Sequence, residues 1–460
     1  MVDLDWKSKR VVSSDSIPNK SLPKLPNKLT VLIPAPLRGG CPAELETASS
    51  SACSAYEHYL RLPELRKLWS CRESPEWKSE PFIRPALQAL EITFRFLSTV
   101  LSDPRPYVNS SEWERQLESI TATELQLVSA LVESGEGTAP IASAPSFSGG
   151  KLARGGSSAE VWRLTAGDNT VVSCTSEASL LPRLAAWRRS EAAAERIQYL
   201  IEGAMRRCPY TLGLGEPNLA AKQSLDYDGI VKPHAVHALR QNPYSDQIQN
   251  HENQTLYTIH QILESWVQSA LELLNRIGGR IESKRFDIAA SDCFLLERVW
   301  KLLAEIEDLH LLMDPADFLR LKSQLEIKSE PAPFCFRSAA LVELTRRCRD
   351  LRQWVPNVLG VEVDPAGGPR VQEAAMRLYR DKAGPEKIHL LQGLQSVEAA
   401  VKRFFYANKQ VVAAVMGSLE AREEGESLSR VFLEPTYFPS LDAAKTFLGD
   451  SLGHKRTRAA

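Results

Sequence analysis

The chain has 460 residues, of which 43% are hydrophobic and 25% are charged, a composition typical of a globular protein with about two or three domains. Its 56 lysines and arginines nearly balance its 57 aspartates and glutamates, so no net charge would draw it to nucleic acid or to an anionic membrane. The eight cysteines are scattered without a CxxC pair, which excludes a disulfide framework and is typical of reduced proteins. No apolar run approaches the ~20 residues of a spanning helix, and we expect a cytoplasmic protein.

The N-terminal part of the sequence predicts a disordered segment followed by helices. Residues 1–50 are rich in proline, serine and lysine without apolar periodicity, which indicates disorder. A predicted N-terminal helical domain spans residues 51–210, with helices over 55–69, 85–100, 111–133 and 181–208. Pro85 suits the first turn of the second helix, and Ser111 and Glu114 form a capping box for the third.

A Gly/Ser-rich region interrupts this domain at residues 134–179. Its small residues predict a flexible insertion that contains at most a short hairpin around Gly167–Asn169. A turn-rich stretch then indicates a boundary near residues 210–245. The predicted C-terminal helical domain is therefore residues 211–460.

Helical periodicity dominates this C-terminal part. Helices are predicted over residues 250–274, 292–313, 338–355, 371–380, 388–419 and 440–449, and Asp314 with Pro315 caps a further one. No strand-rich region and no alternation of strands with helices is found in the sequence. We therefore predict an all-α, multi-helix bundle.

The helix at 250–274 carries His260 on its apolar stripe, and His310 has a similar place on the next helix. An imidazole in a core needs a hydrogen-bond partner, a ligand or a metal, since leaving it unpaired costs roughly 1–3 kcal/mol. A satisfied core histidine is the simpler interpretation. His234 and His237 have a metal-compatible spacing but no third ligand nearby, so we expect no metal site.

Sequence blocks along nearly the whole chain resemble the plant nematode-resistance protein family known as HSPRO. They include YLRLPELRKLW, YTLGLGEPN, NHENQTLYTIHQILESW, LAEIEDLHLLMDPADFLRLKSQL, VEVDPAGGPRVQEAAMRLY and EPTYFPSLDAAKTFLG. The resemblance implies a cytoplasmic plant protein of basal defence and stress responses. It also implies one protein partner, the βγ-type regulatory subunit of the plant sucrose-nonfermenting-related kinase complex. The family supplies no catalytic residues.

The segment around His260 is also similar to the H-Q-x-x-E-x-W motif of haem-dependent tryptophan 2,3-dioxygenases, in which the histidine lines the distal side of the haem. A later D-F-R segment of that family, which binds the substrate carboxylate, has a counterpart in Asp317-Phe318 with Arg320 one step late. The family's proximal haem ligand corresponds to Glu373. The resemblance implies a dioxygenase-like C-terminal half and a vestigial pocket formed by Tyr257, His260, Trp266, His310, Phe318, Arg320 and Glu373.

Two functions follow from these observations. We expect a non-enzymatic regulator or adaptor without catalytic residues, metal or cofactor, because a carboxylate at Glu373 is a poor axial donor for haem iron. The alternative is a haem- or indole-binding protein derived from a dioxygenase-like fold. Neither hypothesis involves nucleic acid or a membrane.

Overall fold

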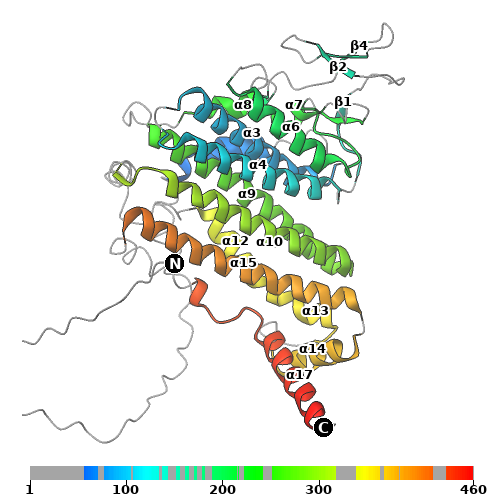
Figure 1. Ribbon diagram of the computed structural model, residues 1–460. Coiled ribbons are helices and arrows are strands. Elements are labelled where there is room, and N and C mark those ends of the chain that lie inside the picture. Colours follow the sequence, from blue (N-terminus) through cyan, green and yellow to red (C-terminus); the bar gives the residue numbers. More distant parts are fainter. Residues whose placement is uncertain are drawn as a thin grey trace, which may run out of the picture. The chain divides into compact units, whose positions relative to one another are not determined.

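The structure is a computed structural model (Figure 1). All of the residues it describes belong to one compact unit, residues 47–460. The predicted disordered segment 1–50 lies outside the described residues, which are 56–70, 77–104, 107–133, 137–142, 152–155, 161–164, 170–172, 179–181, 189–214, 216, 222–241, 251–316, 338–362, 367–382, 384–417 and 431–458.

The first helices are α2 (Leu62–Ser70), α3 (Glu80–Ser102), α4 (Ser110–Glu133) and α6 (Glu191–Met205). The predicted start of α3 is wrong, because Pro81 occupies the first turn and Pro85 lies inside the helix. The predicted capping box of α4 is wrong too. Ser111 Oγ donates to Asn109 Oδ1 over 3.2 Å, and Glu114 accepts from Arg196 instead of reaching back to the start of the helix.

The Gly/Ser-rich region contains a small antiparallel sheet in the order β2-β3-β4. β3 (Val161–Leu164) pairs with β4 (Thr170–Val172) on either side of Gly167–Asn169, which confirms the predicted hairpin. β2 (Leu152–Gly155) adds a third strand that the sequence did not predict. A separate pair joins β1 (Ile141–Ala142) to β5 (Ser224–Leu225).

The rest of the described chain is helical, which confirms the predicted all-α class. Ser338 caps α12 by accepting from the Leu341 N–H, and Asp314 accepts from the Ala316 N–H over 2.8 Å as predicted. No helix in the described part is long and apolar enough to cross a membrane. The elements are α7 (Tyr227–Val231), α8 (Pro233–Ala238), α9 (His251–Glu282), α10 (Phe286–Asp308), η2 (Leu309–Leu312), α12 (Ala339–Asp350), η4 (Leu351–Trp354), α13 (Val355–Leu359), α14 (Pro369–Asp381), α15 (Pro385–Met416) and α17 (Pro439–Arg458).

Helices from both predicted domains share one hydrophobic core. α3 packs along α4 and α9, α9 packs on α10, and α10 packs on α4 and α15 (Figure 1). Leu87, Leu125, Val267, Leu296 and Val401 represent these five helices in the same buried cluster. Each such side chain contributes roughly 1.5–3 kcal/mol when fully buried. The predicted boundary near residue 210 therefore lies within one compact unit.

A close helix contact joins α10 to α15. A Cβ placed on Gly393 of α15 would lie 2.8 Å from Cys293 Cβ and 3.5 Å from the Ala290 carbonyl oxygen of α10. The missing side chain at Gly393 thus lets the two helix backbones approach each other. By contrast, a Cβ on Gly279 of α9 would meet nothing within 4 Å.

We predict opposite effects of alanine at these two glycines. Gly393→Ala should lower the free energy of unfolding by about 1–3 kcal/mol, because the added methyl overpacks the contact with Cys293. Gly279→Ala should raise it by about 0.5–1 kcal/mol, because alanine restricts the unfolded chain and favours the helix. Urea unfolding measures both changes. Equal stability of the two variants would show that the helices do not meet at Gly393.

Candidate functional site

The candidate site is built on the buried face of α9, which carries polar as well as apolar side chains. Tyr257, His260, Gln261 and Trp266 are each 0% exposed, and Glu264 is 2% exposed. All five occupy two to three helical turns amid leucine and isoleucine side chains. Each buried polar group costs free energy unless a hydrogen bond satisfies it. The partners of these side chains therefore decide what the site is.

The Tyr56 phenol lies between His260 and Glu264. Its oxygen is 3.1 Å from His260 Nδ1, and it donates to Glu264 Oε1 over 3.1 Å. Since a phenol has one proton, His260 Nδ1 carries the hydrogen of the first bond and donates to the phenol oxygen. The Tyr56 ring meets the imidazole edge to face, with centroids 5.7 Å apart.

His310 of η2 lies beside His260, with the ring centroids 5.4 Å apart. His310 Nδ1 is 2.8 Å from the Glu307 carbonyl oxygen and 3.3 Å from Glu307 Oε2. Asn408 of α15 donates to the same carboxylate oxygen over 3.2 Å. The structure therefore brings the two predicted imidazoles together in a buried cluster with a carboxylate on one side.

Burial and charge set opposite protonation preferences for the two imidazoles. Burial, assisted by the nearby charge of His310, lowers the pKa of His260 well below its usual value. Burial also opposes the charged form of His310, but the Glu307 carboxylate outweighs it and raises the pKa of His310. Burial raises the pKa of Glu264 to about 7, although hydrogen bonds from Ser338 and Tyr56 act to lower it. His260 is thus kept neutral as a hydrogen-bonding group.

Gln261 and Tyr257 join α9 to parts of the chain that precede it. Gln261 Nε2 donates to the Leu60 carbonyl over 3.2 Å, and its Oε1 accepts from Arg95 of α3 over 2.9 Å. The Tyr257 hydroxyl donates to the Leu239 carbonyl over 2.8 Å. Both side chains therefore donate to buried main-chain carbonyls, and Gln261 also donates to the Leu239 carbonyl over 3.3 Å.

Trp266 and Glu124 form a fully buried polar pair. The indole Nε1 donates to Glu124 Oε1 over 2.8 Å, and Thr93 donates to the same oxygen over 3.2 Å. Burial raises the pKa of Glu124 to about 8, although both hydrogen bonds act to lower it. Glu124 therefore holds a proton at neutral pH, where it links α4 to α3 and α9.

The four matched positions of the H-Q-x-x-E-x-W motif, His260, Gln261, Glu264 and Trp266, all bond to groups of the protein itself. Glu373, the predicted counterpart of a proximal ligand, lies on α14 and is exposed. Phe318 and Arg320 lie outside the described residues. In the part of the chain that the structure describes, no cluster of three or more metal-binding side chains is present. The arrangement cross-links helices through buried hydrogen bonds.

Sequence reasoning missed Tyr56, Arg95 and Glu124 as members of the site. Glu124 carried a detectable signal, because it lies on the apolar stripe of α4 between Ile120 and Val128. Tyr56 carried no such sequence signal, since its partner His260 is 204 positions away.

Comparison with known proteins identifies the relatives of this chain. The family described as "Hs1pro-1 N-terminus" matches residues 1–202, and the one described as "Hs1pro-1 protein C-terminus" matches residues 205–454. The chain belongs to the Hs1pro-1 family. It is 54% identical to "Nematode resistance protein-like HSPRO2" of Arabidopsis thaliana, over 99% of this chain and 100% of that protein. It is 52% identical to "Nematode resistance protein-like HSPRO1" of the same plant, over 92% of this chain and 96% of that protein. The HSPRO resemblance is confirmed.

The buried Glu124 predicts a pH-dependent stability for this Hs1pro-1 family member. Its pKa of about 8 in the folded state exceeds the ordinary value of 4.5, so between these pH values the folded state binds a proton that the unfolded state has lost. This group therefore makes the protein less stable as pH rises through that window. Glu124→Gln keeps both acceptor bonds and removes the titration.

We expect Glu124→Gln to be more stable than the unsubstituted protein at pH 8, by on the order of 3 kcal/mol. At pH 5 the two proteins should be similar. Urea unfolding between pH 5 and 8 measures the difference, and Glu133→Gln, at an exposed position at the end of the same helix, is the matched control. Parallel pH profiles for all three proteins would refute a raised pKa at Glu124.

Proposed function

We propose that the protein is a non-enzymatic, cytoplasmic regulator of plant basal defence and stress signalling. The observation that carries this proposal is its 54% identity, over 99% of the chain, to a relative named for nematode resistance. We propose that the protein has no catalytic activity for a separate reason. Every matched side chain of the one motif that resembles an enzyme is engaged in hydrogen bonds within the protein. Function then depends on the surface.

We propose further that this surface docks on the βγ-type regulatory subunit of the sucrose-nonfermenting-related kinase complex. An aromatic patch beside the C-terminal half of α15 supports this mode of action. Tyr406 is 54% exposed and Leu433 is 73% exposed, while the Phe432 ring lies 5.6 Å from that of Tyr406. Tyrosines backed by apolar side chains are frequent energetic centres of protein interfaces.

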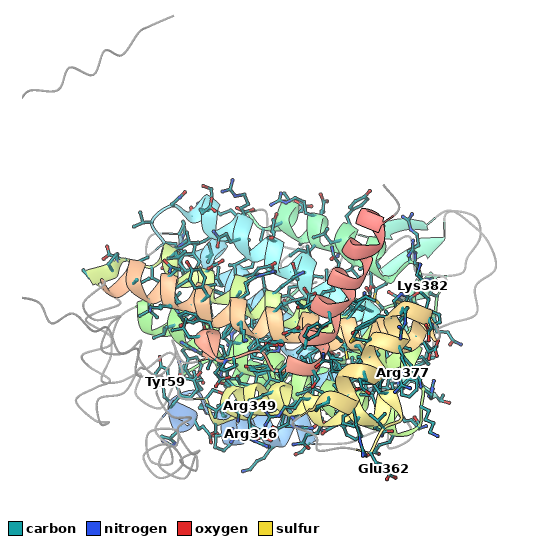
Figure 2. All side chains as sticks on the ribbon, turned by 90° about the horizontal axis from the view of Figure 1, so that it is seen from below. Tyr59, Arg346, Arg349, Glu362, Arg377 and Lys382 are labelled. Carbon is teal, nitrogen blue, oxygen red and sulfur yellow. The ribbon has the colours of Figure 1, made fainter. Side chains whose placement is uncertain are left out.

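Basic side chains offer a second candidate for the docking surface, which we favour less. Figure 2 labels Arg346 and Arg349 on α12 and, apart from them, Arg377 and Lys382 of the α14 region. Arg346 pairs with Glu343 and Asp350 over 2.7 Å each, so its charge is already compensated within α12. Such exposed ion pairs contribute little to binding energy unless they are desolvated. We therefore place the contact at the aromatic patch of Tyr406, Phe432 and Leu433.

Substitution of this patch tests the docking proposal. A Tyr406→Ala, Leu433→Asp double variant should bind the purified kinase βγ subunit at least about tenfold more weakly than the unsubstituted protein, because it removes the aromatic anchor and places a charge in the contact. Affinity measurement by calorimetry or by pull-down with both folded proteins gives the result. Tyr199→Ala is the control, since Tyr199 is 74% exposed on α6. Failure of the unsubstituted proteins to associate would refute the partner, and unchanged binding of the double variant would refute the patch.

A haem- or indole-binding protein is the second candidate, and the adjacent His260 and His310 rings favour it. We propose that neither ligand binds, because the position that corresponds to the proximal haem ligand is Glu373, whose carboxylate is a poor axial donor for haem iron. The purified protein should show no Soret band after reconstitution with haem and no thermal stabilisation by tryptophan or indole. A Soret band that disappears in His260→Ala would establish the alternative.

A further inference from the structure

A cleft of about 540 Å³ opens between α3, α8 and the N-terminal half of α9, apart from the His260 cluster. The polar side chains that line it include Arg95 and Thr99 of α3, His234 and His237 of α8, Arg240, and Thr258 of α9. Among the described residues of the lining there is no aspartate or glutamate. A cleft of this volume is large enough to enclose most of a small organic molecule.

Arg95 gives this cleft its charge. Its guanidinium is nearly buried, with 7% of the residue exposed, yet none of the ion pairs among the described residues involves it. Its hydrogen bonds go to neutral acceptors, namely Gln261 Oε1 at 2.9 Å and the Val236 carbonyl at 3.4 Å. A buried cation without an anionic partner is costly, so a site of this kind is stabilised when an anion enters.

The electrostatics of the surroundings reinforce this preference. Burial lowers the pKa of Arg95 to about 10, and the nearby Arg240 acts in the same direction, while Tyr257 and Glu91 oppose it. At neutral pH Arg95 is still charged. A bound oxyanion relieves the cost of burying the Arg95 guanidinium near a second positive charge.

The Glu91 carboxylate, which contacts His237 of the cleft lining, already has four hydrogen-bonding partners. Glu91 accepts from the Ser179 hydroxyl at 2.7 Å, the Leu180 N–H at 2.8 Å and the Tyr227 hydroxyl at 2.9 Å, and His237 Nε2 lies 2.8 Å from it. These four contacts fix the position of the Glu91 carboxylate next to His237. Glu91 is therefore not a partner that neutralises Arg95 through a direct bond.

We propose that this cleft binds a small organic anion, through a carboxylate or phosphate group held by Arg95 and Arg240. Arginine forms paired hydrogen bonds to either oxyanion, and the exposed Arg240 at the rim contributes to capture from solvent. Binding of such a metabolite would affect how α8 and α9 are positioned. It is independent of the docking proposal.

Titration of the full-length protein with three probes tests the inference. Inorganic phosphate, glycerol 3-phosphate and succinate are each added at constant ionic strength, with sodium chloride as the reference, and binding is followed by calorimetry and thermal unfolding. We expect saturable binding and a higher melting temperature with at least one probe. Binding of the two phosphates alone would identify a phosphoryl site, and binding of succinate would identify a carboxylate site.

Substitutions locate the binding. Arg240→Gln should raise the dissociation constant about tenfold without affecting folding, because Arg240 is exposed and its main-chain carbonyl, not its side chain, holds Gln254. Arg95→Gln should abolish binding, and Arg95→Lys should restore part of it, since it keeps the charge but not the paired donors. Arg207→Gln, at an exposed position outside the cleft, is the control and should bind like the unsubstituted protein. No saturable binding of any probe, or equal affinity in Arg240→Gln, would overturn the proposal.

Discussion

The requirement that buried polar groups be hydrogen-bonded governs this molecule more than any single apolar contact. α9 places an imidazole, an amide, a carboxyl group and an indole inside the protein, and none of them could be left without a partner at an acceptable cost. Their partners come from Tyr56, the Leu60 carbonyl, Arg95 and Glu124. The N-terminal helices are thereby fixed on α9 with one register, since a shift by one turn would break every bond of the set.

This network shows what the four matched side chains of the H-Q-x-x-E-x-W motif contact in this fold. Side chains in the order His-Gln-x-x-Glu-x-Trp can line a cofactor cavity or join helices, and the partners present in space decide between the two. Here a tyrosine phenol touches the imidazole, and a protonated carboxylic acid receives the indole N–H. The two family segments, residues 1–202 and 205–454, consequently meet in one core, as α3 and α9 show.

The sequence was sufficient for features encoded within a few turns of chain. Apolar periodicity located α9, α10 and α15, and it placed His260 and His310 on core faces. The start of α3 was predicted wrongly, because Pro81 and not Pro85 lies in its first turn. The partners of the site could not be predicted, because the bonds of Tyr56 to α9 span more than 200 residues and no local pattern encodes such a pairing. Arg95 was hidden for the same reason.

The burial of α3 has a consequence for how the chain is made. From Phe82 to Leu97 every residue of this helix is buried, and much of the cover is provided by α9, which begins about 150 residues later. At ordinary rates of ribosomal elongation that delay is on the order of 10 s, far longer than a helix needs to form. Until α9 has been made, the nascent chain therefore carries α3 with only part of its cover, which α4 supplies.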